Sequence, residues 1–425
     1  MTEGTAGYIP ELCRQAKSAS RSMALAPREQ KDAALRAMAA ALQRNAAEIL
    51  TVNQQDIRQA QTSGLSPALV DRLSLTPERL NGIISSLEDV AMLPDPVGAE
   101  FDQRVMPNGL VLHKQRVPLG LIAVVYESRP NVTIEVASLA LKSGNALVLR
   151  GGSETITTNR ALVAAVRSGL AHAGLPQEAV QFIEDPDRNH VLTLLKMHDQ
   201  VDMLIPRGGN ALHSFCRENS SIPVITGGIG ICHLFIDDSA DLEAALPVIR
   251  NAKVQRPSVC NALDTLLVHQ SVSSEFLPRV VDQLKKDGVT FRAEPLALSF
   301  LTGADPSIVQ PAGPEDFDTE WLSLVLGLKV VADVDEAIRH IAEHSTAHSD
   351  GILSANDANI TRFVYEVDSA VVYVNASTRF TDGGQMGMGA EVAVSTQRLH
   401  ARGPMALEEL TTYKWVARGQ YHIRA

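Results

Sequence analysis

Residues 121–150 read LIAVVYESRPNVTIEVASLALKSGNALVLR, and this stretch decides the fold class. An apolar run at 121–126 is followed by a helix-like segment and then by a second apolar run at 146–150. Short apolar strands that alternate with helices are typical of a mostly parallel sheet in an α/β domain. The sequence therefore predicts that an α/β domain begins at Leu121.

The same alternation continues towards the C-terminus. Further apolar runs are AVQFI (179–183), MLIP (203–206), PVIT (223–226) and HLFID (233–237), and a second set is DTLLVH (264–269), LGLKVV (326–331), GILS (351–354) and AVVYVN (370–375). These two sets predict two α/β domains, and we expect the boundary between residues 241 and 254.

The first hundred residues have a different pattern. Residues 10–95 are expected to be helical, with one apolar helical face made by Leu35, Met38, Leu42 and Ile49. Thr76-Pro77 predicts a helix start, with threonine as N-cap and proline at the first helical position. Pro107-Asn108-Gly109 predicts a β-hairpin turn, because Asn-Gly tolerates positive φ.

Composition narrows the function. The chain has 425 residues and a net charge of −11, which makes a nucleic-acid or anionic-membrane partner unfavourable. The four cysteines form no C-x-x-C pair, which favours a reducing, cytoplasmic location. We expect neither a secretory signal at the N-terminus nor a membrane span, because no apolar run reaches about 18 residues.

The segment 253–261, KVQRPSVCN, is the richest in reactive side chains. Cys260 falls at the expected junction of the two domains, where clefts form. Arg256 could stabilise its thiolate, the nucleophilic form of cysteine. The alternative is that Cys260 is a small buried apolar side chain, which is what most free cysteines are.

Glycine-rich turns follow several of the predicted strands. Arg150-Gly151-Gly152-Ser153 could contact a phosphate or ribose at the carboxyl end of a strand, or could be an ordinary turn. Arg207-Gly208-Gly209 is a second such turn, and a third glycine cluster lies at 227–230. None of them is a G-x-G-x-x-G that opens a helix, so the usual dinucleotide fingerprint is absent.

Two other polar segments have competing interpretations. His340-Ile341-Ala342-Glu343-His344 matches the short zinc motif H-x-x-E-H, but its surroundings are typical of an amphipathic surface helix, so we expect no metal. The loop 376–384, which carries Arg379, could be a functional loop or a solvated one.

Taken in order, five segments resemble the aldehyde dehydrogenase superfamily, and within it the branch that reduces γ-glutamyl phosphate: 117–154, 203–209, 222–233, 251–269 and 373–405. The resemblance covers nearly the whole chain. It implies an α/β, aldehyde dehydrogenase-like fold with a cofactor-binding domain (1–98 and 119–245), a catalytic domain (246–402) and an oligomerisation flap (99–118 and 403–425). We expect the flap hairpin and the strand 407–416 to pair across subunits.

The resemblance also implies roles for single residues. Cys260 would be the nucleophile and Asn131 the side chain that stabilises the oxyanion. The remaining assignments are cofactor binding by Arg150, Gly151, Gly152, Ser153, Gly208 and Glu320, and substrate binding by Arg129, Arg256 and Arg379.

One departure from the wider superfamily favours reduction. Hydrolytic members carry a water-activating glutamate just before paired glycines, whereas this chain reads VITGG at 224–228. An enzyme that must not hydrolyse its thioester should lack that base. The expected reaction is therefore the NADPH-dependent reduction of L-glutamyl 5-phosphate to L-glutamate 5-semialdehyde and phosphate, a step of proline biosynthesis.

The alternatives are a hydrolytic NAD(P)-dependent aldehyde dehydrogenase and a non-catalytic scaffold. Retention of Cys260 within an intact motif argues against the scaffold. The resemblance further implies a homo-oligomer, and the lability of an acyl phosphate favours glutamate 5-kinase as a partner.

Overall fold

The computed structural model describes residues 7–227 and 229–424. The chain divides into two compact units. Unit 1 comprises Met1–Thr226, Gly387–Ala393 and Met405–Ala425, and unit 2 comprises Gly227–Met386 and Val394–Pro404.

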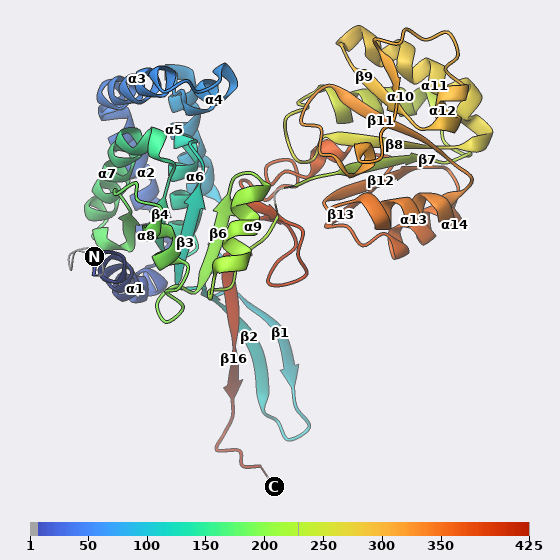
Figure 1. Cartoon of the computed structure of the whole chain (residues 1–425). Helices are drawn as coiled ribbons and strands as arrows, with labels where there is room; N and C mark the ends of the chain where they lie inside the picture. Colours follow the sequence, from blue (N-terminus) through green and yellow to red (C-terminus); the bar gives the residue numbers. More distant parts are fainter. Residues whose placement is uncertain (1–6, 228, 425) are drawn as a thin grey trace. The chain divides into compact units, whose positions relative to one another are not determined.

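Unit 1 is built on a four-stranded parallel sheet in the order β5-β4-β3-β6 (Figure 1). Its strands are β3 (Leu121–Tyr126), β4 (Ala146–Arg150), β5 (Val180–Phe182) and β6 (Met203–Arg207). Its later helices are α6 (Pro130–Lys142), α7 (Ile156–His172), α8 (Asn189–Leu194) and α9 (Asn210–Asn219), with 3₁₀ turns η1 (Ser153–Thr155) and η2 (Gln177–Ala179). All six β3 residues are buried, as expected for a parallel strand covered on both faces.

The first hundred residues are helical, as the sequence predicts. The helices are α1 (Tyr8–Leu25), α2 (Arg28–Arg44), α3 (Ala46–Thr62), α4 (Pro67–Leu73) and α5 (Pro77–Met92). The Thr76 side chain accepts a hydrogen bond from the Arg79 N–H at 3.2 Å, which confirms the predicted N-cap. The predicted apolar face was too long, because the helix breaks at Asn45 and Ile49 belongs to α3.

The predicted hairpin is confirmed, and the C-terminal strand pairs with it. β1 (Glu100–Val105) and β2 (Val111–Pro118) pair antiparallel, and β16 (Thr411–Arg418) pairs antiparallel with β2 in the same chain. The hairpin and β16 thus form one three-stranded flap within the chain, and pairing of this flap across subunits stays a prediction. The three strands extend as a ribbon away from the parallel sheet of unit 1 (Figure 1).

Unit 2 contains a seven-stranded parallel sheet in the order β10-β9-β11-β8-β7-β12-β13. Its strands are β7 (Cys232–Ile236), β8 (Leu263–His269), β9 (Thr290–Ala293), β10 (Val309–Pro311), β11 (Val325–Val331), β12 (Ser349–Leu353) and β13 (Val371–Val374). Its helices are α10 (Leu242–Val254), α11 (Gln270–Leu284), α12 (Pro295–Ser299), α13 (Val334–His344) and α14 (Asp357–Glu366), with 3₁₀ turns η3 (Lys285–Asp287), η4 (Asp316–Asp318) and η5 (Thr378–Phe380).

The boundary between the units lies earlier than the sequence predicts. β7 was assigned to the cofactor-binding domain, which was expected to reach residue 245, but β7 pairs with β8 and β12 of the unit 2 sheet. Hydrophobic runs alone do not say which sheet a strand joins.

Two smaller differences concern strands. The predicted strand 223–226 is only an isolated bridge between Val224 and Leu204, while β9, β10 and the short pair β14 (Ala393–Ser395) and β15 (Gly403–Met405) were not predicted. Within the described residues, none of the helices combines the length and apolar character that crossing a membrane requires.

Candidate functional site

Unit 1 contains a cavity of about 660 Å³ at the carboxyl ends of its parallel strands. In open α/β sheets this edge is the usual ligand-binding edge. Four arginines and two glutamates contribute to its lining, and the apolar walls come from α4, α8 and α9. The lining includes Arg72, Glu127, Ser128, Arg129, Arg150, Gly152, Ser153, Glu154, Pro186, Arg188, Val191, Leu212 and Phe215.

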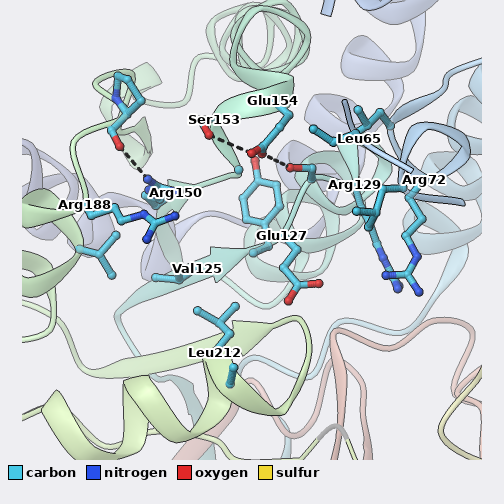
Figure 2. A pocket seen from close by; sticks show the side chains of 18 of the residues that line it. Leu65, Arg72, Val125, Glu127, Arg129, Arg150, Ser153, Glu154, Arg188 and Leu212 are labelled. Atoms are coloured by element: carbon cyan, nitrogen blue, oxygen red, sulfur yellow. Dashed lines mark hydrogen bonds between the residues drawn. The ribbon is translucent and has the colours of Figure 1, made fainter. Parts of the chain in front are cut away.

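The last residue of β4, Arg150, is held by backbone carbonyls. Its guanidinium donates to the Gly151 oxygen at 2.8 Å and to the Pro186 oxygen at 3.0 Å. Burial lowers the pKa of Arg150, the Glu154 carboxylate opposes this, and the charge of Arg188 lowers it further. Arg150 and Arg188 therefore lie close enough to repel each other, as Figure 2 shows at one end of the pocket.

The glycine turn after β4 brings backbone close to two polar side chains. A Cβ on Gly152 would lie 2.1 Å from the Ser128 Oγ, so a larger residue would displace that serine. Ser128 Oγ donates to Glu154 at 2.5 Å, and Ser153 Oγ donates to the same carboxylate at 3.1 Å. Burial raises the pKa of Glu154, but these hydrogen bonds and one from its backbone N–H outweigh burial, and the pKa is lowered overall.

The second glycine turn, after β6, is stabilised by a hydrogen bond to Glu127. The Gly209 N–H donates to Glu127 Oε1 at 2.7 Å, and the neighbouring Gly208 has the same carboxyl group against its Cα. Gly208 itself is not in the pocket wall, whereas Glu127 is. Gly151 also lies behind the wall, against Tyr126 and Asn159.

Two of the predicted catalytic and substrate residues lie at the start of α6. Arg129 is the N-cap residue of this helix and lines the same pocket as Arg150. Asn131 is half-buried, and its side-chain N–H donates to Glu135 at 2.8 Å. The structure thus brings Arg129 together with the predicted cofactor residues Arg150, Gly152 and Ser153.

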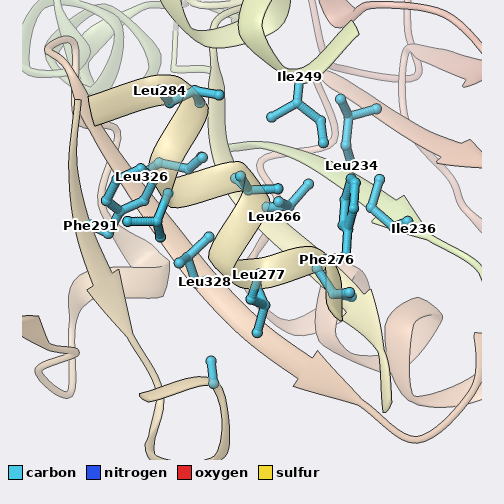
Figure 3. Close-up of a cluster of buried hydrophobic side chains, with 14 of the residues drawn as sticks. Leu234, Ile236, Ile249, Leu266, Phe276, Leu277, Leu284, Phe291, Leu326 and Leu328 are labelled. Carbon is cyan, nitrogen blue, oxygen red and sulfur yellow. The ribbon is translucent and has the colours of Figure 1, made fainter. Parts of the chain in front are cut away.

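In unit 2, Cys260 lies in the turn between α10 and β8. These elements pack on an apolar cluster that includes Leu234, Ile249 and Leu266 (Figure 3). Next to this cluster, Lys253 at the end of α10 and Asp264 at the start of β8 form a buried ion pair at 3.4 Å. The pair joins the two ends of the Cys260 loop, and Asp264 also accepts from the Trp321 N–H at 3.3 Å.

The backbone of Cys260 contacts β7 and the turn that precedes this strand. The Cys232 thiol donates to the Cys260 carbonyl oxygen at 3.2 Å. A Cβ at Gly230 would lie 1.5 Å from the same oxygen, so only glycine permits this approach. Cys260 is partly exposed, unlike Cys13, Cys216 and Cys232, which are buried.

The loop after β13 packs beside Cys260 and brings two of the predicted arginines together. The Asn261 side chain donates to the Thr381 oxygen at 2.9 Å, and the Thr378 hydroxyl donates to the Asn261 oxygen at 2.7 Å. Burial lowers the pKa of Arg379, the charge of Arg256 lowers it further, and Asp382 and the Cys260 sulfur oppose the shift. The two guanidinium groups and the sulfur therefore lie within electrostatic reach of one another.

Glu320 is connected to the same loop through Gly230. Its carboxylate accepts from the Gly230 N–H at 2.9 Å, and burial raises its pKa against the opposing effect of that hydrogen bond. The structure thus places Cys260, Arg256, Arg379 and Glu320 in unit 2, and Arg129, Asn131, Arg150, Gly151, Gly152, Ser153 and Gly208 in unit 1.

The H-x-x-E-H segment forms α13, but it is not purely a surface helix. His340 is buried and its ring contacts His233 edge-on at 5.4 Å, whereas His344 bonds Asp318 at 2.7 Å. No group of three or more His, Cys, Asp or Glu in the described part of the chain has an arrangement that could hold a metal ion.

Sequence reasoning missed several residues. Arg188 follows β5 in an Asp185-Pro186-Asp187-Arg188 turn, so the strand-end argument used for Arg150 could have found it. Leu212 and Phe215 could not be predicted as pocket residues, because an apolar helix face has the same sequence pattern whether it lines a core or a pocket. The ion pair between Lys253 and Asp264 could not be predicted, because the sequence does not say how the loop between these residues folds.

Comparisons with known proteins agree with this architecture. Residues 1–292 match the family model described as "Aldehyde dehydrogenase family". The γ-glutamyl phosphate reductase of Aeromonas salmonicida is 56% identical over 98% of this chain and 100% of its own, and that of Roseiflexus castenholzii is 53% identical over 98% and 99%.

Solved structures give the same result. The crystal structure of γ-glutamyl phosphate reductase from Thermotoga maritima is 46% identical, has a TM-score of 0.95, and the match covers 98% of this chain and 100% of that one. An acetylating aldehyde dehydrogenase from Geobacillus thermoglucosidasius, 18% identical over 98% of each chain with a TM-score of 0.68, shares the fold. The chain therefore belongs to the aldehyde dehydrogenase family, and within it to the γ-glutamyl phosphate reductases.

Proposed function

We propose that this chain reduces L-glutamyl 5-phosphate to L-glutamate 5-semialdehyde and phosphate, with NADPH as reductant and a thioester on Cys260 as intermediate. One observation carries the mechanism: the partly exposed Cys260 lies within electrostatic reach of Arg379, which in turn feels the charge of Arg256. A thiolate nucleophile beside two cations suits an anionic acyl donor.

The pocket of unit 1 fits a dinucleotide. It combines apolar walls from Leu212, Phe215 and Val191 with cations at the strand ends, and its volume of about 660 Å³ is in the range of small-molecule sites. Arg150, Gly152 and Ser153 would hold the cofactor there, and Gly151 and Gly208 would shape the turns behind them. Glu320 is proposed to hold the nicotinamide ribose. When bound, the cofactor supplies hydride.

The residues of this chain perform the acyl transfer. The Cys260 thiolate attacks the acyl carbonyl, a carbon–sulfur bond forms, and the carbon–oxygen bond to phosphate breaks, so that phosphate leaves with the electron pair. Arg256 and Arg379 stabilise the negative charges of the substrate. The Cys260 N–H and Asn131 are proposed to stabilise the oxyanion, and Arg129 is proposed to assist substrate binding.

The rival function is aldehyde oxidation by hydrolysis of the thioester. That reaction needs a base to activate water, and the segment 224–228 carries no carboxylate, although Gly228 lies outside the described residues. We therefore propose that phosphate, and not water, is the acyl acceptor in the reverse direction.

The test is the reverse reaction, in which the semialdehyde, phosphate and NADP⁺ are mixed and NADPH absorbance is followed. Phosphate-dependent formation of NADPH supports the proposal, and phosphate-independent formation restores the hydrolytic alternative. Cys260→Ala should abolish turnover and retain NADPH binding, whereas Cys216→Ala should keep activity, because Cys216 is buried on α9. Normal turnover by Cys260→Ala would refute the assignment of the nucleophile.

Assembly belongs to the same proposal. Tyr413 and Trp415 are half-exposed on β16, one of the two outer strands of the ribbon, and unpaired strand edges seek partners. We propose a homo-oligomer built through this ribbon, together with an association with glutamate 5-kinase that shields the acyl phosphate from water. Light scattering at micromolar concentration tests the first, and a wild-type monomer would refute it. Co-sedimentation with the purified kinase tests the second.

A further inference from the structure

We propose that Arg188, together with Arg150, binds the 2′-phosphate of NADPH and so selects NADPH over NADH. This inference rests on the proposed function, which already assigns NADPH to the pocket of unit 1. It adds a residue that sequence reasoning did not single out, and it assigns one phosphate group to one pair of arginines.

The pair has the properties of an anion site. Within the described residues, no carboxylate lies within ion-pairing distance, 4.0 Å, of the guanidinium of either Arg150 or Arg188. Arg150 is nevertheless fixed in place, because the Gly151 and Pro186 carbonyls accept two of its N–H groups at 2.8 and 3.0 Å. A phosphate dianion between the fixed Arg150 and the exposed Arg188 would relieve their mutual repulsion and gain charge-assisted hydrogen bonds.

Glu154, the carboxylate whose charge acts on Arg150, is held by other groups. Glu154 accepts hydrogen bonds from Ser128 at 2.5 Å and from Ser153 at 3.1 Å, so its oxygens are already occupied. A carboxylate turned towards the arginines would neutralise them and repel a phosphate. The serine hydrogen bonds hold the Glu154 carboxylate and so keep the arginine pair available for a ligand; Figure 2 draws them as dashed lines to Glu154.

The position of the pair in the fold points to the 2′-phosphate and not to the pyrophosphate. β3, α6 and β4 form a βαβ unit, and Arg150 is the last residue of its second strand. In dinucleotide-binding folds the residue near this strand end meets the ribose 2′ position: an acid for the hydroxyl of NAD, an arginine for the phosphate of NADP. Arg188 follows β5, which pairs with β4, so it approaches the same strand end from the next strand.

The apolar part of the pocket agrees with this orientation. Val191, Leu212 and Phe215 line the cavity together with Arg188 and Pro186. A purine ring that packs on these side chains would place its ribose near the strand end. Arg72 and Arg129 lie on the opposite side of the pocket in Figure 2, where a more distant anionic group of the same ligand could reach them.

The experiment is equilibrium binding by isothermal titration calorimetry to the full-length protein. The ligand pairs are 2′,5′-ADP against 5′-AMP and NADPH against NADH, which differ only in the 2′-phosphate. Arg188→Gln should weaken binding of 2′,5′-ADP and NADPH about 10- to 100-fold, as expected for loss of a charged hydrogen bond, and should leave 5′-AMP and NADH within about twofold. Arg188→Lys, which keeps the charge, should fall between wild type and Arg188→Gln.

The control is Arg160→Gln, which removes an exposed, ion-paired arginine on α7 outside the pocket and should change none of the four affinities. An Arg188→Gln variant that weakens both members of each pair equally, or neither, would overturn the assignment of Arg188 while wild type still prefers NADPH. Wild-type protein that binds 2′,5′-ADP no better than 5′-AMP would overturn the proposed cofactor as well.

Discussion

The buried end of the Cys260 loop and its exposed side differ in how their positive charges are compensated. At the buried end, Lys253 is fully inaccessible and has Asp264 as its acid partner. On the exposed side, Arg256 and Arg379 lie near each other, and neither has a carboxylate within ion-pairing distance in the described part of the chain. The buried lysine is part of the support of the loop, and the arginines are available to a ligand.

The same contrast recurs in unit 1. Lys142 is fully inaccessible, bonds Asp32 and donates to the Ala91 oxygen at 2.9 Å, which ties α2, α5 and α6 together. Among the residues that the structure describes, no carboxylate forms an ion pair with Arg150 or Arg188 at the carboxyl ends of the strands, although the charge of Glu154 acts on Arg150. In both units, then, a fully buried lysine has an acid partner, and a pair of arginines without an ion-paired carboxylate among the described residues marks a candidate anion site. The predictions below test this distinction.

The largest effect is expected from removing the anion that Arg256 and Arg379 are proposed to accept. With semialdehyde and NADP⁺ in phosphate-free buffer, NADPH should form in a burst near one per active site and then stop, because the thioester has no acceptor. Adding phosphate should restart the reaction. Steady NADPH formation without phosphate, followed by absorbance, would mean that another base activates water.

The second effect concerns the paired lysine. Lys253→Met leaves the buried Asp264 carboxylate without its cation and should lower the free energy of unfolding by about 3–5 kcal/mol. Lys253→Met/Asp264→Leu should recover part of that loss. Arg250→Met is the matched control on the same helix, since Arg250 pairs with Asp287 at the surface, and it should cost at most about 1 kcal/mol. Urea denaturation measures all three, and equal losses for Lys253→Met and Arg250→Met would refute the distinction.

The third effect concerns the unpaired arginines. Arg379→Gln removes a charged donor from the substrate and should lower kcat/KM about 10- to 100-fold, while the urea midpoint stays near that of wild type. Arg379→Lys should retain part of the activity, because it keeps the charge but not the fork of donors. Arg339→Gln, at an exposed position of α13, is the control. A variant that loses stability and activity together would show that Arg379 is structural.

The sequence predicted the strands better than the sites. Apolar runs such as 121–126 and 264–269 became β3 and β8, because a strand buried on both faces has a continuous apolar pattern. The same pattern does not encode pairing, which is why the sequence places β7 in the wrong domain. Cys260 and Arg150 could be found because they sit in recognisable segments.

What the sequence could not supply is electrostatic context. Whether a cation has an acid partner depends on residues far apart in the chain, as with Lys142 and Asp32, which are 110 positions apart. The position of Arg188 after a strand marks it as a candidate but does not say whether it has an acid partner, and Lys253 has the same sequence signal as a surface lysine. Only their neighbours in space separate a candidate phosphate site from a buried ion pair.

The smallest effect is expected from a buried histidine, His348, which burial keeps neutral in the folded protein. His348 is fully inaccessible, and burial lowers its pKa to about 4 against the opposing charge of Asp350. Between pH 7 and pH 5 the unfolded chain takes up a proton at this residue, because its unfolded pKa is 6.5, and the folded chain does not. Unfolding therefore becomes easier as the pH falls, by about 1–2 kcal/mol from His348 alone.

Asp264 acts in the opposite direction. Burial raises its pKa to about 6, although the charge of Lys253 opposes the shift, so the folded chain takes up a proton near pH 6 while the unfolded chain remains ionised down to 3.8. The net pH dependence of wild-type stability is thus a difference of opposing contributions.

Comparing wild type with His348→Asn in urea at pH 7 and pH 5 isolates the histidine, since Asp264 is common to both. The variant should lose less stability on acidification than wild type, by that same 1–2 kcal/mol. Parallel losses in the two proteins would mean that His348 takes up its proton in the folded state, and that a buried cation is tolerated there without the close acid partner that Lys253 has.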